Sequence, residues 1–452
     1  MQSLMGTEAR PNIKVPIPGP NAQKIVDKDH EWVATTTKTS PIAGKRGIGS
    51  VVEDVDGNIL LDFTAGIGVV NLGHCHPAVN KAVQEQMASL VHFAGTDFYY
   101  EVQAELARRL AEKAPGAKRR KVFYTNSGAE SVEAAIKVAK WSADRRQFLA
   151  FQGAFHGRTA GAGSLTASKP VQRARFFPTM PGVTHVPYAN PYRNVWGIDG
   201  YDEPEELVSR TIGYLEDFVF KTHLPPDEVA AFFTEPVQGE GGYIVPPKGF
   251  YKRLKGLCED HGILYVADEV QTGFGRTGKW FGIEHEEVEP DIMTLAKGIA
   301  NGFPMGACVF DAELDFGVKG AHSNTYGGNL ISCTAALTVM DVLEKEPIFD
   351  NVEARGKELK KGLMEIQEDE PRVGDVRGRG LMVCADFVTD PKTKGFDTEG
   401  RDKMIEASWK RGLMLLPCGK SGIRFIPPLV VSQEQVEGAL EVFRDAVKAV
   451  YA

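Results

Sequence analysis

The chain of 452 residues lacks an excess of basic residues and has no long apolar run. Its 52 Lys and Arg residues face 60 Asp and Glu residues, which gives a formal net charge of −8. A protein whose main partner is nucleic acid or an anionic membrane needs a basic face, so this balance argues against both. No run approaches the length of a transmembrane helix, and residues 1–24 contain no apolar core of a signal peptide. We therefore expect a soluble, cytoplasmic protein.

Cysteine is scarce, and its spacing is irregular. No two of the cysteines form a CxxC pair; they are Cys75, Cys258, Cys308, Cys333, Cys384 and Cys418. A zinc site or a disulfide framework needs closer or paired spacing, so we expect neither. Both the cysteine usage and the missing signal peptide fit a reducing compartment.

What the sequence does contain is a series of short apolar runs separated by amphipathic helical patterns. Helical periodicity covers residues 77–91 and 100–113, among others. The apolar runs are 122–124, 148–151, 229–233, 263–267 and 306–310. This alternation indicates an α/β protein with a mostly parallel sheet covered by helices on both faces.

The chain is too long for one compact core, so we expect two domains. Residues 71–340 carry the alternating pattern and predict a large α/β domain. Residues 1–70 and 341–452 together predict a smaller α+β domain. Within it, an Asp-Gly-Asn turn in residues 49–63 predicts an antiparallel hairpin, and Ser432 with Gln435 predicts a capping box at the start of the last helix.

Ligands of open parallel sheets bind beyond the carboxyl ends of the strands, so the residues after each apolar run are candidates for function. Ser127, Gly128, Ala129 and Glu130 follow the first run and open a helical pattern. Ser127 and Glu130 predict a capping box, and Gly128 lets a ligand approach the first free backbone N–H groups. This helix start is suited to a phosphate group, although an ordinary N-cap explains the same residues.

The second run is followed by an aromatic residue and a histidine between glycines. Phe155 on such a loop can stack on a planar heterocycle, and Arg158 can present a bidentate fork to a carboxylate. The alternative is a core phenylalanine beside a surface His156.

Glu235 and Glu240 lie in the Gly-rich loop after the third run. Paired carboxylates suggest glycosidase or metal chemistry, but no third carboxylate or histidine nearby completes a ligand set, so we expect no metal.

Asp268 ends the fourth run and is a candidate counter-ion for a ring nitrogen that must stay protonated. The segment after it, 273–279, has the G-x-x-x-x-G-K spacing of a phosphate loop. However, Trp280 stands where a Ser or Thr is needed for Mg²⁺, so a nucleotide-binding protein is the weaker interpretation.

Lys297 stands between an apolar run and a loop broken by Gly and Pro. Loss of water contact favours the neutral amine, which can form a Schiff base with an aldehyde; a snorkelling lysine is the alternative. A helix start for phosphate, a stacking ring, a buried aspartate and a strand-end lysine are together the parts that a pyridoxal-phosphate site requires.

Six ordered motifs make this combination specific: TNSGAESVEAAIKVAK, GAFHGRTAG, EPVQGEGGY, ADEVQTGFGRTGK, DIMTLAKGIANGFPMGA and SNTYGGNLISCTAAL. With them, nearly the whole chain resembles the class III (ω-amino acid) aminotransferases of the fold-type I pyridoxal-phosphate enzymes. This group includes 4-aminobutyrate and ornithine aminotransferases. The resemblance implies a large domain with a seven-stranded sheet and a smaller α+β domain built from both termini.

The resemblance also implies how pyridoxal 5'-phosphate is held. Lys297 would carry it and move the proton, and Asp268 would pair with its ring nitrogen. The other implied cofactor-binding residues are Ser127, Gly128 and Ala129 at the phosphate, Phe155 stacked on the ring, His156, Glu235 in support, Gln271 at the 3-hydroxyl, and Thr325 from the partner of a homodimer or dimer of dimers.

For the substrate, Arg424 is similar to the arginine that grips an α-carboxylate, and Glu240 to the acidic residue that masks it. Arg158 with Ile67 is similar to the arrangement that holds a distal carboxylate. The implied reaction moves an amino group from an ω-amino acid to a 2-oxo acid such as 2-oxoglutarate. The alternative is an amino-acid racemase of the same family, which needs a second base that the sequence does not name.

Overall fold

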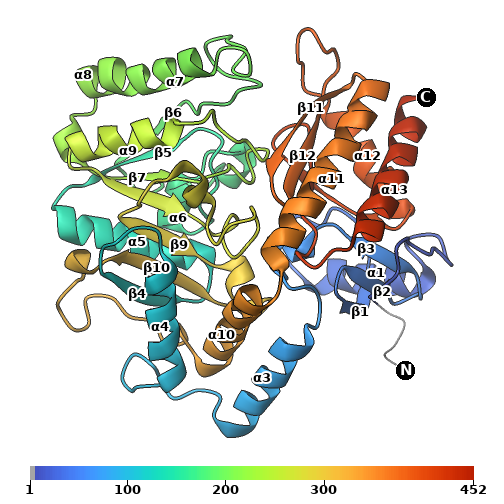
Figure 1. Ribbon diagram of the computed structural model, residues 1–452, viewed down its shortest axis with the longest axis horizontal. Coiled ribbons are helices and arrows are strands. Elements are labelled where there is room, and N and C mark those ends of the chain that lie inside the picture. The colour runs from blue at the N-terminus through green and yellow to red at the C-terminus, as the bar shows by residue number, and fades with distance from the viewer. Residues whose placement is uncertain (1–5) are drawn as a thin grey trace. The chain divides into compact units, whose positions relative to one another are not determined.

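The computed structural model describes residues 6–452 and divides the chain into two compact units (Figure 1). The larger unit is Ala78–Glu346, and the smaller one joins the residues up to Pro77 with Pro347–Ala452. Over the described range, no helix is both long enough and apolar enough to cross a membrane.

The larger unit contains the expected seven-stranded, mostly parallel sheet, which confirms that prediction. In spatial order its strands are β4 (Arg120–Thr125), β10 (Gly306–Asp311), β9 (Ile292–Leu295), β8 (Leu264–Asp268), β7 (Val229–Thr234), β5 (Gln147–Phe151) and β6 (Val183–Val186). Only β10 is antiparallel to its neighbours, β4 and β9. Every residue of β7, β9 and β10 is buried, as expected for strands covered on both faces.

Helix α5 (Gly128–Ala143) is the central helix of this unit. Its Ala-rich sequence favours a helix, and its small side chains let it lie close to the sheet. It contacts β4, β7, β8, β9 and β10, and its Val132 and Ile136 belong to one core cluster with Phe148 and Phe233. The position of α5 therefore depends on several strands at once.

The larger unit contains further helices besides α5 (Figure 1). They are α3 (Pro77–Ser89), α4 (Glu101–Lys113), α6 (Ala160–Leu165), α7 (Pro204–Gly213), α8 (Phe220–Thr222), α9 (Phe250–Asp260) and α10 (Leu330–Lys345). Asn329 caps α10 by accepting a hydrogen bond from the Ser332 amide at 3.0 Å.

The smaller unit has two four-stranded sheets. The first pairs β1 (Gly44–Ile48), β2 (Val51–Asp54), β3 (Ile59–Asp62) and β13 (Leu413–Met414); the second pairs β11 (Val373–Arg379), β12 (Met382–Phe387), β15 (Gly422–Phe425) and β14 (Leu416–Cys418). The β2–β3 hairpin confirms the expected antiparallel pair. Because β3 also pairs with β13, the N-terminal and C-terminal segments of the smaller unit share one sheet.

Helices α1 (Pro20–Trp32), α2 (Ala65–Gly68), α11 (Ile348–Asp369), α12 (Thr398–Lys410) and α13 (Gln433–Tyr451) complete the smaller unit. Both hydrogen bonds of the expected capping box between Ser432 and Gln435 are present at the start of α13. That local prediction is confirmed.

Candidate active site

The residues expected to hold a cofactor in the larger unit follow the carboxyl ends of five strands. Ser127 follows β4, Phe155 follows β5 and Glu235 follows β7, while Asp268 ends β8 and Lys297 follows β9. These five strands run in the same direction. The strand β10, which lies between β4 and β9, is antiparallel to both, and the other neighbouring pairs are parallel. Their ends consequently lie at one edge of the sheet, where ligands of such sheets bind.

The start of α5 has the geometry of an anion site. Ser127 is the N-cap, and its hydroxyl accepts a hydrogen bond from the Glu130 amide at 3.2 Å. Gly128 and Ala129 lie in the first turn, where backbone N–H groups have no acceptor within the helix. A Cβ at position 128 would lie 2.9 Å from Val270 Cγ1 and 3.1 Å from Val270 Cγ2, so any larger residue would require Val270 to shift. This arrangement suits a phosphate group.

Of the two hydrogen bonds in the capping box expected at this helix, only the one to the Ser127 hydroxyl forms. The prediction for the Glu130 side chain is wrong. The carboxylate of Glu130 accepts from the amide of Asn126 at 2.7 Å and from its side chain at 2.9 Å, instead of from the amide of Ser127. Glu130 therefore fixes the loop before the cap, and its own helix start remains open toward a ligand.

Asp268 and His156 form a buried pair. Asp268 Oδ2 lies 2.7 Å from His156 Nδ1, and Oδ1 accepts from the Val270 amide at 3.1 Å. Burial lowers the pKa of His156, but its hydrogen bond and charge interaction with Asp268 outweigh burial, and the pKa is raised. Only 3% of His156 is exposed, so the alternative of a surface histidine is wrong.

Glu235 connects two loops of the site. Its Oε1 accepts from the Phe155 amide and its Oε2 from the Gly239 amide, both at 2.9 Å. Burial raises the pKa of Glu235 to about 7, against the nearby charge of His156. The carboxyl group thus fixes the backbone of the loop that carries Phe155.

The loop that carries Phe155 is also fixed by Thr166. The Thr166 hydroxyl accepts from the amides of His156 at 3.0 Å and Gly157 at 3.2 Å. Phe155 is half-buried, and the exposed Arg158 has its guanidinium carbon 5.7 Å from the centre of the Phe155 ring.

Lys297 begins a short 3-10 helix, Lys297–Ala300, directly after β9. Its side chain is half-buried, and its φ is +47°, in the left-handed region that non-glycine residues rarely adopt. Strained backbone of this kind tends to occur at functional sites. The geometry agrees with a lysine that is placed for chemistry at a strand end.

Glu240 forms an ion pair with Lys169, with 2.6 Å between Oε1 and Nζ. Thr325 is exposed, and the neighbouring Asn324 donates to the carbonyl of Tyr124 at 2.7 Å. The segment with Thr325 is therefore attached to the end of β4.

Two of the expected substrate residues belong to the smaller unit. Arg424 lies on β15 opposite Cys384 of β12. Ile67 lies in α2 with φ +70° and is 48% exposed. A β-branched side chain in the left-handed region is an outlier, which marks this turn as strained.

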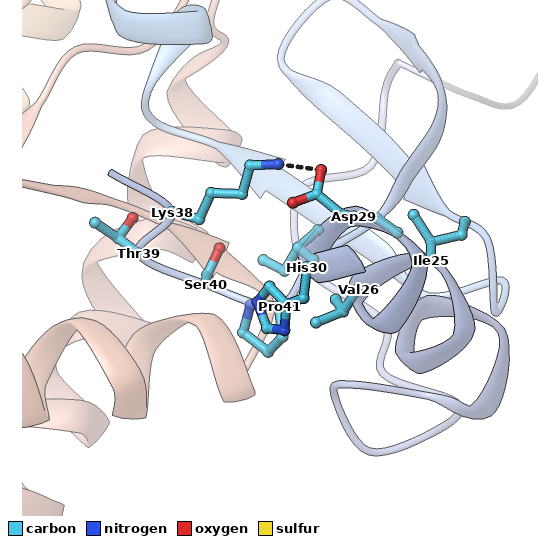
Figure 2. A pocket seen from close by; sticks show the side chains of 10 residues that line it. Ile25, Val26, Asp29, His30, Lys38, Thr39, Ser40 and Pro41 are labelled. Carbon is cyan, nitrogen blue, oxygen red and sulfur yellow. Dashed lines mark hydrogen bonds and ion pairs between the residues drawn. The ribbon is translucent and has the colours of Figure 1, made fainter. Parts of the chain in front are cut away.

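A pocket of about 350 Å³ also lies in the smaller unit, between α1 and residues 38–43 (Figure 2). Ile25, Val26 and Ile42 contribute apolar lining, and Asp29 forms an ion pair with Lys38 at its rim. None of the residues expected to bind cofactor or substrate lines it.

Residues 33–447 match the family model of the class-III aminotransferases. The chain belongs to this family. It is 40% identical to the alanine/serine racemase of Pyrococcus horikoshii (97% of this chain, 93% of that protein) and 39% to the acetylornithine aminotransferase of Methanopyrus kandleri (95% and 99%). It is 36% identical to a probable 4-aminobutyrate aminotransferase of Bacillus subtilis (89% and 92%).

Among solved structures, an (S)-enantioselective ω-transaminase from Thermomicrobium roseum superimposes with a TM-score of 0.88 at 34% identity, covering 96% of this chain and 99% of that one. The expected fold class is confirmed. Class-III aminotransferases are pyridoxal-phosphate enzymes, so this aminotransferase uses that cofactor.

The larger unit of this aminotransferase contains groups that suit the parts of pyridoxal phosphate. Gln271 Oε1 is buried and accepts no hydrogen bond within residues 6–452, so it suits a ligand hydroxyl. The first turn of α5 suits the phosphate, and Asp268, held by His156, offers a buried carboxylate. In contrast, residues 273–279 form turns rather than a helix start, which contradicts the phosphate-loop interpretation.

Sequence reasoning missed three residues that shape this site. No sequence pattern pointed to the contacts of these residues. Ser131 and Lys169 each contact a residue far away in the chain, and Thr166 accepts from the amides of His156 and Gly157, ten and nine positions earlier. Lys169 and Glu240, for example, are separated by 71 positions. Only the folded chain brings such pairs together.

Glu269, beside Asp268, predicts a pH-dependent stability. It is fully buried, and it accepts hydrogen bonds from Thr272 and from the amides of Gly282 at 2.8 Å and Ile283 at 2.7 Å. Burial outweighs these donors and raises its pKa from 4.5 to about 7. Between these values the unfolded chain loses the proton first, so the free energy of unfolding falls by about 3 kcal/mol as pH rises.

Denaturant unfolding of the wild type and of Glu269→Gln at pH 5 and pH 7.5 measures this contribution. The amide cannot accept from all three donors, so the variant is less stable at both pH values. Between pH 5 and pH 7.5, the free energy of unfolding of the variant should fall by about 3 kcal/mol less than that of the wild type. An unchanged pH difference would contradict the assignment.

Proposed function

We propose that this enzyme moves an amino group from an ω-amino acid, such as 4-aminobutyrate or ornithine, to a 2-oxo acid such as 2-oxoglutarate. One observation carries the choice of reaction: the four carboxylates at the end of β8 and in the segments directly after β7 and β8 each already accept hydrogen bonds or form an ion pair. These are Glu235, Glu240, Asp268 and Glu269. Transfer needs a base on one face of the substrate, whereas racemisation needs one on each. This arrangement favours Lys297 acting alone.

Bound pyridoxal phosphate supplies an electron sink for the substrate carbon that loses its proton. In our proposal Lys297 Nζ would hold the cofactor at its aldehyde carbon; once the substrate's amino group has taken its place there, the freed amine would take and return the substrate proton. The remaining groups would hold the cofactor in place: the Gly128 and Ala129 amides and the Ser127 cap at the phosphate, Phe155 on the ring face, Gln271 at the 3-hydroxyl, and Asp268, backed by His156, at the ring nitrogen.

For the substrate we infer that Arg424 binds the carboxylate next to the reacting carbon of an α-amino acid. Glu240 would neutralise that arginine when an ω-amine is presented. In the described structure Glu240 forms an ion pair with Lys169, so neutralising Arg424 would require Glu240 to exchange or share this partner. Arg158 and the strained turn at Ile67 would receive a distal carboxylate.

Reaction of single amino donors with 2-oxoglutarate tests the proposal. Amine transfer should form glutamate from 4-aminobutyrate or ornithine faster than from alanine or leucine. Turnover confined to α-amino donors without a distal group would contradict the substrate assignment. Absence of glutamate with every donor would contradict the reaction.

A second candidate is an amino-acid racemase, favoured by the 40% identity to the Pyrococcus horikoshii alanine/serine racemase. Such a reaction needs no oxo acid and delivers the proton to the opposite face of the substrate. Incubation with a single L-amino acid distinguishes the two. Formation of the D-enantiomer without 2-oxoglutarate supports racemisation, and a strict requirement for 2-oxoglutarate supports transfer.

We also infer a homodimer in which Thr325 reaches the partner's phosphate site. Exposed apolar side chains cluster in sequence around α3 and the loop after it: Met87, Leu90, Val91, Phe93, Phe98 and Tyr99, with Tyr326 beside Thr325. His92 and Tyr326 rings lie 5.4 Å apart, which brings these segments together. Exposed apolar patches of this kind mark interaction surfaces. A monomeric mass by light scattering would contradict the dimer.

A further inference from the structure

Ser131 lies in the second turn of α5, between the anion site and the strand that leads to Lys297. It is fully buried. Its Oγ lies 2.8 Å from Thr125 Oγ1, 3.0 Å from the carbonyl oxygen of Leu295 and 3.1 Å from that of Ser127. Thr125 is the last residue of β4 and Leu295 the last of β9.

The hydroxyl protons allow one arrangement that joins these groups into a chain. A hydroxyl has one proton to donate and two lone pairs to accept. If Thr125 donates to Ser131 rather than to the Ser127 carbonyl 3.2 Å away, Ser131 can donate its proton to the carbonyl of Leu295, the nearer of its two carbonyl acceptors. The hydroxyl of Ser131 then connects the end of β4, helix α5 and the end of β9.

This connection passes over β10, which lies between β4 and β9 in the sheet. Gly306, the first residue of β10, makes room for it. A Cβ at this position would lie 2.4 Å from Thr125 Oγ1 and 2.5 Å from Ser131 Oγ and from the Ser127 carbonyl. A side chain at 306 would therefore separate the hydroxyl groups.

The two structures joined by Ser131, the first turn of α5 and the segment with Lys297, would hold opposite ends of pyridoxal phosphate. The first turn of α5 suits the phosphate, and Lys297 stands two residues beyond Leu295 in a left-handed conformation. The hydrogen bond from Ser131 fixes the last strand carbonyl before this strained turn. Because a covalent and an anionic contact must be made at once, a small change in their separation weakens binding.

We propose that Ser131 is a positioning residue that sets the separation between the phosphate site and Lys297 for pyridoxal phosphate. It touches neither cofactor nor substrate. The inference rests on the family's cofactor and holds for amine transfer and for racemisation alike.

The affinity of the apoprotein for pyridoxal phosphate tests this proposal in a double-mutant cycle, followed by quenching of protein fluorescence. Ser131→Ala should raise the Kd about tenfold, the factor that corresponds to the loss of a hydrogen bond worth about 1.4 kcal/mol. In a Lys297→Ala background the covalent contact is gone, so the same serine substitution should raise the Kd less than about twofold.

Two outcomes would overturn the proposal. An equal loss in both backgrounds would mean that Ser131 serves the phosphate site alone. No loss in either background, with only a lower melting temperature, would mean that its role is structural. Ser131→Cys, which keeps the size and a weak donor, should bind more tightly than Ser131→Ala and gives the same test if the alanine variant fails to fold.

Ser408→Ala is the matched control. Ser408 is also a fully buried helical serine, and its hydroxyl donates at 2.7 Å to the Met404 carbonyl of its own helix α12 in the smaller unit. Its Kd for pyridoxal phosphate should equal that of the wild type. As a second readout, the pH midpoint of the visible absorbance of the holoenzyme should shift in Ser131→Ala and stay unchanged in Ser408→Ala.

Discussion

Lys297→Ala should lower the turnover number for amine transfer by about four orders of magnitude, because it removes both the nucleophile and the proton carrier. The fold should survive, since the side chain is only half-buried and alanine keeps the Cβ, so that the backbone at φ +47° is no more strained than with lysine. Turnover at saturating donor and 2-oxoglutarate measures the loss. The visible absorbance of the holoenzyme should disappear in parallel.

Lys297→Arg and Lys248→Ala complete this experiment. Arginine keeps the positive charge but is not a nucleophile at neutral pH, so Lys297→Arg should be as inactive as the alanine variant. Lys248 is an exposed lysine of the same unit, and its replacement should leave turnover unchanged. A Lys297→Ala enzyme that retained a tenth of wild-type turnover would refute the assignment.

Asp268→Asn should lower the turnover number by roughly two to three orders of magnitude, since the negative charge opposite the cofactor's ring nitrogen is lost. The amide is nearly the same size, so packing is preserved. Removal of the carboxylate also removes the interaction that raises the pKa of His156, and that pKa should fall. Steady-state kinetics and a histidine NMR titration measure the two effects.

Asp291→Asn provides the comparison for Asp268. Asp291 is another buried aspartate of the larger unit; it lies before β9 and forms an ion pair with Lys255 at 2.8 Å. Its replacement should reduce stability and leave turnover per folded enzyme within about twofold. If Asp268→Asn changed turnover as little as Asp291→Asn, Asp268 would have no role at the cofactor.

The five strand ends were predictable because each consists of a short apolar run followed by residues that are unusual at the end of a buried strand. Asp268 and Lys297 stand out for this reason. Strand β6 was not predicted, since Val183–Val186 is short and only its last residue is buried. The β1 strand was missed because its five residues, GKRGI, contain two glycines and two basic residues.

The connections between the strand ends could not be predicted. Ser131 reads as an ordinary helical serine in the motif TNSGAES, and its contact with Leu295 spans 164 positions. The sequence left open whether His156 is buried or on the surface, because nothing local shows that Asp268 lies 2.7 Å away. Such contacts depend on strand order, which the sequence pattern leaves open.

The family assignment fixes the cofactor, while the names of the relatives divide between transfer and racemisation. Both reactions require the same lysine, so the identity of that lysine is central to the account. Borohydride reduction of the holoenzyme followed by peptide mass spectrometry tests it most directly. The account predicts one pyridoxyl group per chain, on Lys297. A label on another lysine, or no label on a holoenzyme saturated with pyridoxal phosphate, would contradict it.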